Sequence, residues 1–322
     1  MRLKLVPHDT KIDFFARSRI TFTGSIMAVV LSVALFAVMG LNFGIDFRGG
    51  TTIRTESAAP VDVGAYRDAI QPLGLGDVKI TEVFDPTFGP NQNVAMVRIE
   101  AQEGQEAATP EMVLAVEEAL RAIAPDITFP SVESVGPKVS GELIWTAVEA
   151  VVAAIVAVLI YIWLRFEWQF AVGAVAALIH DVLITIGIFA VFQIPFDLAI
   201  IAALLTIVGY SLNDTVVVFD RVRENLRKFR KTPLAEVLNL SINETLSRTV
   251  MTSGTTLIAL IALLVLGGDV IRGFVFAMTL GVIIGTYSSV FVASNILLML
   301  GVKRDWSKPD ANQGNQFGKV DA

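Results

Sequence analysis

The chain has 322 residues, of which 54% are hydrophobic and 17% are charged, and its mean hydropathy is +0.64. Soluble globular chains contain about 45–50% apolar and about 25% charged residues, so this composition excludes an ordinary soluble protein and indicates an integral membrane protein. The net charge of −6 argues against nucleic acid as a partner, because phosphate binding needs concentrated lysine and arginine. Cysteine is absent and histidine occurs twice, so we expect no disulfide, no dedicated metal site and no cofactor.

Six apolar stretches are long enough, or nearly so, to cross a hydrocarbon layer of about 30 Å, which takes about 20 helical residues. They are residues 20–40, 143–164, 168–192, 198–219, 249–267 and 273–300. The first stretch contains no charge and is followed by a poor cleavage site, so we expect it to remain as a signal anchor. The sequence therefore predicts a membrane α-helical protein with six transmembrane helices.

Basic side chains beside the spans predict the orientation, because cytoplasmic loops are enriched in lysine and arginine. They cluster in residues 1–19, in the segment 220–248 and in the tail 301–322, whereas the long loop 41–142 is acidic. We therefore expect both termini in the cytoplasm and the loop 41–142 outside. The second half of the segment 220–248 is amphipathic and is predicted to lie along the cytoplasmic membrane surface as a separate helix before the fifth span.

The loop 41–142 is long enough to form a domain. Extended and helical patterns follow one another in the order β-α-β-β-α-β, with Thr109 as an N-cap and Pro110 at the first position of the second helix. The predicted strands and helices are residues 51–56, 61–73, 78–84, 93–100, 110–124 and 127–135. This order predicts one α+β ferredoxin-like extracytoplasmic domain between the first two spans, followed by spans two to six in residues 143–300.

Ionisable side chains in an apolar span cost about 2.5–3.5 kcal/mol each on insertion scales, so they are the best functional candidates. The predicted spans and their ends contain Glu149, His180, Asp181, Asp214 and Arg248. At 1.5 Å per residue, Asp214 lies roughly 24 Å from the outer end of the fourth span. For Glu149, the alternative is simple contact with the polar interface.

Asp214 belongs to a polar stripe of the fourth span that also contains Asn213, and the fifth span carries a similar stripe with Arg248 and Thr252. We predict that the two stripes face each other and form a hydrated proton path, with Asp214, Arg248 and Asn213 as the relay. A helix shift that changed the separation of Asp214 and Arg248 would load or release a proton. The alternative is a structural ion pair that fixes helix packing.

A secondary relay is predicted from three further polar residues of the spans, His180, Asp181 and Thr252. For His180 and Asp181, a hydrogen-bonded packing pair is an equally good interpretation.

Three stretches taken together resemble the SecF members of the SecD/SecF family of bacterial protein-export membrane subunits. They are FGIDFRGG at 43–50, GYSLNDTVVVFDRVREN at 209–225 and TLSRTVMTSGTT at 245–256. The segment 135–139 and the pair at 180–181 also look like the family, and the resemblance covers essentially residues 14–300. The chain looks like a stand-alone SecF form, with SecD as a separate chain.

The resemblance implies an accessory subunit that acts with SecD beside the SecY-SecE-SecG channel on a translocating preprotein. It implies a place in the bacterial cytoplasmic (inner) membrane, in contact with membrane lipid, and use of the proton-motive force. The spans would form half of a resistance–nodulation–division architecture, with SecD supplying the other half. The family's proton-carrying aspartate and its arginine partner map by motif onto Asp214 and Arg248. The coupling ion would be H⁺, with Na⁺ as the alternative.

The glycine-rich signature would then shape a hinge between the first span and the external domain and carry no chemistry of its own. Its residues are Gly44, Asp46, Arg48, Gly49 and Gly50.

Three other functions are weighed against this one. An independent proton-coupled exporter of small molecules would be expected to carry a second half of its own. An intramembrane aspartyl protease could use Asp181 and Asp214, but no glycine flanks Asp214, and we expect no enzyme. A passive assembly scaffold would depend on the external domain and helix packing, and its intramembrane charges would not matter.

Overall fold

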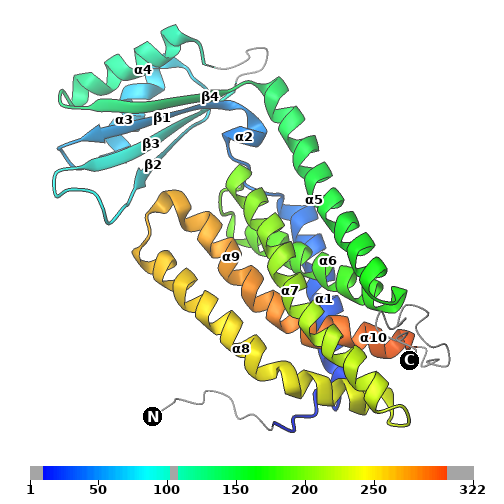
Figure 1. The fold of residues 1–322 in the computed structure, drawn as a ribbon. Coiled ribbons are helices and arrows are strands. Elements are labelled where there is room, and N and C mark those ends of the chain that lie inside the picture. The colour runs from blue at the N-terminus through cyan, green and yellow to red at the C-terminus, as the bar shows by residue number, and fades with distance from the viewer. Residues whose placement is uncertain (1–9, 102–107, 303–322) are drawn as a thin grey trace, which may run out of the picture.

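A computed structural model describes residues 10–101 and 108–302. Most of the predicted tail 301–322 and the first half of the N-terminal segment 1–19 lie outside these ranges. Figure 1 shows a long helical bundle with a small sheet domain at one end, and α1 begins at the other end of the bundle.

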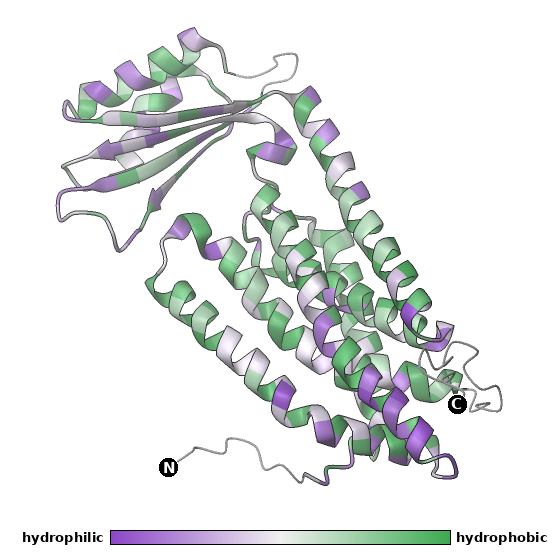
Figure 2. Ribbon diagram, in the orientation of Figure 1, coloured by the Kyte–Doolittle hydropathy of each residue, from purple (hydrophilic) through white to green (hydrophobic). Residues whose placement is uncertain are grey.

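The described residues contain six helices long and apolar enough to cross a membrane, as predicted. The last of them consists of α9, a π-helical turn η2 and α10, which follow one another without a break. The bounds are α1 (Ser18–Met39), α5 (Pro137–Arg165), α6 (Trp168–Phe192), α7 (Leu198–Lys228), α8 (Leu234–Leu266), α9 (Asp269–Ser288), η2 (Ser289–Ala293) and α10 (Ser294–Leu300). Figure 2 shows the apolar bundle between two more polar regions, the sheet domain and the turn between α7 and α8.

The fifth span differs from the prediction. The amphipathic run and the apolar span form one helix of 33 residues, α8 (Leu234–Leu266), instead of two elements that meet at residue 249. No glycine or proline interrupts this helix before Gly254. Polar contacts also tie its beginning to the end of α7, because Asn225 donates to Ser241 over 3.0 Å and to Glu244 over 2.6 Å.

The sheet domain, residues 50–135, has the predicted ferredoxin-like topology. Its antiparallel strands lie in the order β2-β3-β1-β4, which is the order that two interleaved β-α-β units produce. The bounds are β1 (Gly50–Ser57), α3 (Val63–Ile70), η1 (Gln71–Leu73), β2 (Val78–Val83), β3 (Asn93–Glu100), α4 (Pro110–Ile123) and β4 (Thr128–Val135). Thr109 caps α4 by accepting from the Met112 N–H, and Val116 and Leu120 of α4 pack into a core with Ile53 and Val97.

Helices α6 and α9 form the centre of the bundle, whereas α1, α5 and α8 expose most of their side chains. Small residues permit this packing: a Cβ on Gly281 of α9 would clash with Ile207 of α7, and a Cβ on Gly187 of α6 would clash with Ser32 of α1. The two central helices therefore approach their neighbours closely, and polar side chains in the core reach partners on adjacent helices.

Candidate functional site

Asp214 lies on the buried side of α7, with 6% of its surface exposed. Two hydroxyls from different helices donate to its carboxylate: Thr249 Oγ1 of α8 to Oδ1 over 2.7 Å, and Ser289 Oγ of η2 to Oδ2 over 2.8 Å. Each oxygen of this carboxyl group thus has one donor, and both donors are neutral groups.

Arg248 is exposed, and among the described residues no salt bridge joins it to Asp214. The reason is the helical periodicity of α8, in which successive side chains point about 100° apart. Because Thr249 faces α7, its neighbour Arg248 must point elsewhere.

Some, but not all, residues of the polar stripes predicted on the fourth and fifth spans contact each other. Tyr210 of α7 donates to Thr256 of α8 over 3.2 Å, and Asp214 contacts Thr249 as described above. Asn213 is exposed on α7, and Thr252 is exposed on α8, where its hydroxyl bonds to backbone carbonyls of its own helix. The structure therefore does not bring Asn213 to the buried carboxylate or Thr252 to the pair at 180–181.

Asp181 is the second buried carboxylate, with 1% of its surface exposed. His180 Nδ1 lies 2.9 Å from its Oδ1, and two serine hydroxyls donate to its Oδ2: Ser211 of α7 over 2.6 Å and Ser288 of α9 over 2.8 Å. Glu149, by contrast, is exposed on α5. The structure thus makes His180 and Asp181 a central hydrogen-bonded pair.

Sequence reasoning missed four consecutive polar residues where α9 passes into η2. Their side chains contact four different helices: Thr286 bonds to Ser253 of α8, Tyr287 to Ser25 of α1, Ser288 to Asp181 of α6 and Ser289 to Asp214 of α7. A run of four hydroxyls inside an apolar span was the available signal. The π-helical turn begins with the last of the four, Ser289, and such turns often occur at functional sites.

Ser288 and Ser289 are neighbours in the chain, and they connect the two buried carboxylates Asp181 and Asp214. Each donates to a different aspartate, so a rotation or shift of this junction would alter both hydrogen bonds together. A hydrogen bond to a charged group contributes about 1.5–3 kcal/mol, so these contacts are strong enough to fix the local register of three helices.

The signature segment forms α2 (Ile45–Arg48) and attaches the sheet domain to the bundle. Asp46 accepts from the Leu198 N–H at the start of α7 over 3.0 Å, and the Gly44 N–H donates to the Phe196 carbonyl over 2.8 Å. Arg48 pairs with Glu100 of β3 at 2.8 Å.

The glycine pair that follows has positive φ angles of 75° at Gly49 and 130° at Gly50. A Cβ on Gly50 would also collide with the carbonyl oxygen of Ile99. The predicted backbone role of these glycines therefore has a steric basis.

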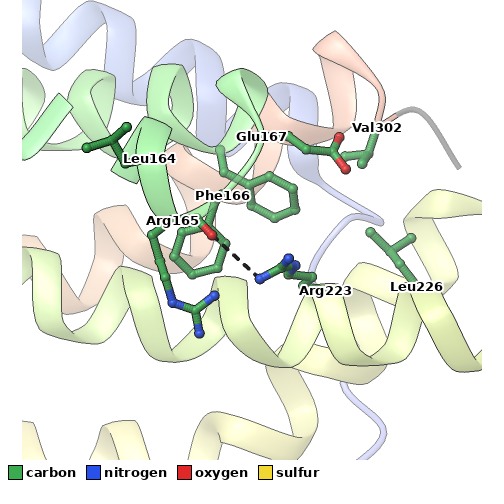
Figure 3. Close-up of a pocket in the computed structure, with 8 residues that line it drawn as sticks. Leu164, Arg165, Phe166, Glu167, Arg223, Leu226 and Val302 are labelled. Atoms are coloured by element: carbon green, nitrogen blue, oxygen red, sulfur yellow. Dashed lines mark hydrogen bonds between the residues drawn. The ribbon is translucent and has the colours of Figure 1, made fainter. Parts of the chain in front are cut away.

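A small polar hollow lies at the end of the bundle far from the sheet domain, beside the turn between α5 and α6 (Figure 3). Arg223 donates to the Arg165 carbonyl over 3.5 Å there, and Arg165 pairs with Asp220 at 3.4 Å. Burial raises the pKa of Glu167, and the Arg223 guanidinium opposes that shift. This group of charged side chains lies at the end of the bundle, where it can anchor the turn between α5 and α6 at the membrane interface. It is separate from the buried carboxylates Asp181 and Asp214.

Comparison with known families and proteins gives a consistent result. A family model described as "Protein export membrane protein SecD/SecF, C-terminal" matches residues 115–303, and one described as "SecD/SecF GG Motif" matches residues 34–61. The protein translocase subunit SecF of Cereibacter sphaeroides is 64% identical over 321 residues, which covers 100% of this chain and 99% of the relative.

Fused relatives match over part of their length. The protein translocase subunit SecDF of Brucella abortus is 41% identical over 94% of this chain and 39% of its own. The crystal structure of SecDF from Thermus thermophilus, a translocon-associated membrane protein, superposes with a TM-score of 0.81 and 35% identity, covering 93% of this chain and 40% of that one. The family models, the relatives that match along their full length and the shared fold agree: the chain belongs to the SecD/SecF family of protein-export membrane proteins.

Proposed function

We propose that this chain is an accessory subunit of the Sec protein-export machinery, which acts with SecD and uses the proton-motive force to complete translocation of a preprotein through the SecY-SecE-SecG channel. Asp214 takes up and releases the coupling proton, and Arg248 biases its charge state through space. The relatives' names support the export role, and the geometry around Asp214 supports its assignment.

One observation carries the assignment. Asp214 is a buried carboxylate on a membrane-spanning helix, and both of its hydrogen-bond donors are neutral hydroxyls, Thr249 and Ser289. A carboxylate locked in a salt bridge would resist protonation, whereas a hydroxyl can donate to the charged form and accept from the protonated form. Each elementary charge that crosses the membrane releases about 2.3 kcal/mol per 100 mV, which is the energy available for work on the preprotein.

The exposed polar side chains of the bundle support a partner in the membrane. Asn213 and Thr206 of α7, and Arg248 and Thr252 of α8, are exposed on helices long and apolar enough to cross a membrane, where contact of polar groups with lipid would be costly. A second helical half would cover them, and the fused relatives carry more than twice the length of this chain. SecD is that second half in the proposal.

The positions of the sheet domain and of the basic turn support the proposed orientation of the chain in the membrane. The sheet domain lies at one end of the bundle, and the basic turn between α7 and α8 lies at the other (Figure 2). Because basic loops stay in the cytoplasm, the termini are cytoplasmic and the sheet domain is extracytoplasmic.

The test is Asp214→Asn, which preserves the shape of the side chain and cannot carry the charge; one of the two hydroxyls then accepts from the amide NH₂ instead of donating. We expect it to abolish gradient-stimulated export in membrane vesicles that contain SecD, while assembly with SecD persists. The matched control is Asp220→Asn, which changes an exposed carboxylate of the same helix and should export like wild type. Full export by Asp214→Asn would support the passive scaffold instead.

A further inference from the structure

A pocket between α1, α6 and α9 lies beside the buried pair His180–Asp181. Its lining includes His180 of α6, Tyr287 of α9, and Ser25 and Gly24 of α1. The ring of His180 stacks on that of Tyr287 with centroids 6.2 Å apart, and Ser25 Oγ lies 3.0 Å from the Tyr287 hydroxyl. The pocket thus joins apolar walls to three polar groups within the membrane-spanning part of the bundle.

The partners of Asp181 leave one oxygen for His180. Ser211 and Ser288 both donate to Oδ2, so Oδ1 accepts from His180 Nδ1 when Asp181 is ionised. The neutral imidazole then has its lone pair on Nε2. That nitrogen is buried and has no hydrogen-bond partner within the described part of the chain.

A buried acceptor without a partner in the protein is uncommon and needs a specific explanation. A carboxylate that accepts from Nδ1 fixes the tautomer and orientation of the ring, so that Nε2 presents its lone pair. Asp181 and Tyr287 contact the ring, and Ser25 contacts the Tyr287 hydroxyl.

We propose that His180 Nε2 is a second proton-uptake site, which takes a proton from water in this pocket. A hydronium ion gives its proton to Nε2 and leaves as water; the imidazolium then passes its Nδ1 proton to Asp181 Oδ1, which leaves a neutral ring with its proton on Nε2. Because Ser288 donates to Asp181 and Ser289 donates to Asp214, loading this pair alters the junction that also holds Asp214.

The inference rests on the proposed function and makes it more specific. Na⁺ prefers oxygen ligands, whereas a histidine nitrogen with a free lone pair and a carboxylate behind it suits a proton. The pair therefore favours H⁺ over Na⁺ as the ion taken up at this second site.

Access to the pocket can be tested without measuring export. In a chain carrying His8→Gln, His180 is the only histidine, and diethyl pyrocarbonate should modify its free nitrogen in proteoliposomes that contain SecD. Gly24→Leu should slow this modification by about tenfold, since the site has open space for a Cβ and the larger side chain would enter the pocket. Met27→Leu, on an exposed position of the same helix, is the control. Modification that occurs only after denaturation would overturn the assignment.

Proton uptake tests the role. We expect His180→Gln to slow gradient-driven proton uptake by about a hundredfold, as for loss of a general base, with His8→Gln at the wild-type rate. Wild-type uptake by His180→Gln, or uptake driven by a sodium gradient alone, would overturn the inference. If Asp214→Asn stops proton uptake while His180→Gln does not, the proposed function is supported and only the role of His180 is wrong. If Asp214→Asn also transports normally, the proposed function itself fails.

Discussion

At the scale of residues, individual hydroxyl groups provide the hydrogen bonds to the Asp214 carboxylate. Thr249 and Thr252 are one helical turn apart on α8, yet only Thr249 reaches the carboxylate, while Thr252 bonds to carbonyls of its own helix. The same residue type thus serves the site at one position and only the backbone at the other.

This difference gives a matched pair of substitutions. Thr249→Val keeps the side-chain shape but removes a donor to a buried carboxylate, so we expect a loss of about 1.5–3 kcal/mol in stability and a clear fall in gradient-stimulated export. Thr252→Val should change both by little, because its hydroxyl has no partner outside its own helix among the described residues. Thermal unfolding of the complex with SecD and vesicle export provide the measurements. Equal effects of the two substitutions would show that the Thr249 hydrogen bond has no special role.

At the scale of elements, the first residue of β1 has a backbone conformation and surroundings that only glycine can accept. Gly50 has a φ angle of 130° and lies so close to β3 that a Cβ would overlap the Ile99 carbonyl. The hinge between α2 and β1 therefore needs glycine for both conformational and steric reasons.

Gly50→Ala should consequently destabilise the sheet domain, by about 1–3 kcal/mol for the backbone conformation alone. Gly89→Ala, in the turn between β2 and β3, is the comparison: its Cβ would have open space and its φ is not positive, so we expect a change within about 0.5 kcal/mol. Limited proteolysis of the full chain measures the opening of the domain. Equal protease resistance of both variants would contradict the steric account.

At the scale of the molecule, the sheet domain is tied to the outer ends of two helices. Asp46 holds the first N–H of α7, and Phe84 and Asp269 exchange two hydrogen bonds of 2.7 Å and 2.8 Å at the start of α9. Helix α7 carries Asp214, and α9 leads into Ser289. A shift of α7 against α9 at the carboxylate would therefore move the two attachment points of the domain relative to each other.

Locking one attachment tests this coupling. Phe84→Cys with Asp269→Cys should form a disulfide on oxidation that lowers gradient-stimulated export, and a reductant should restore it. Because the chain has no cysteine of its own, the new bond is unambiguous within it. Thr51→Cys with Ser134→Cys, a cross-strand pair whose hydroxyls lie 2.6 Å apart inside the domain, should export normally when oxidised. Normal export with the first pair locked would show that the domain does not move with the helices.

The sequence alone determined the number of long apolar helices, the topology of the sheet domain and the presence of a carboxylate, Asp214, within one of these helices. Each rests on a local signal: long apolar runs, alternating strands with clear turns, and a charge where charges are costly. The tertiary structure decided which side chains surround the carboxylates. Helical periodicity assigns residues to a face but leaves the rotation of that face to packing, so Thr249 takes the place predicted for Arg248. The hydrogen-bond partners of the four hydroxyls at 286–289 are likewise set only when four other helices pack around them.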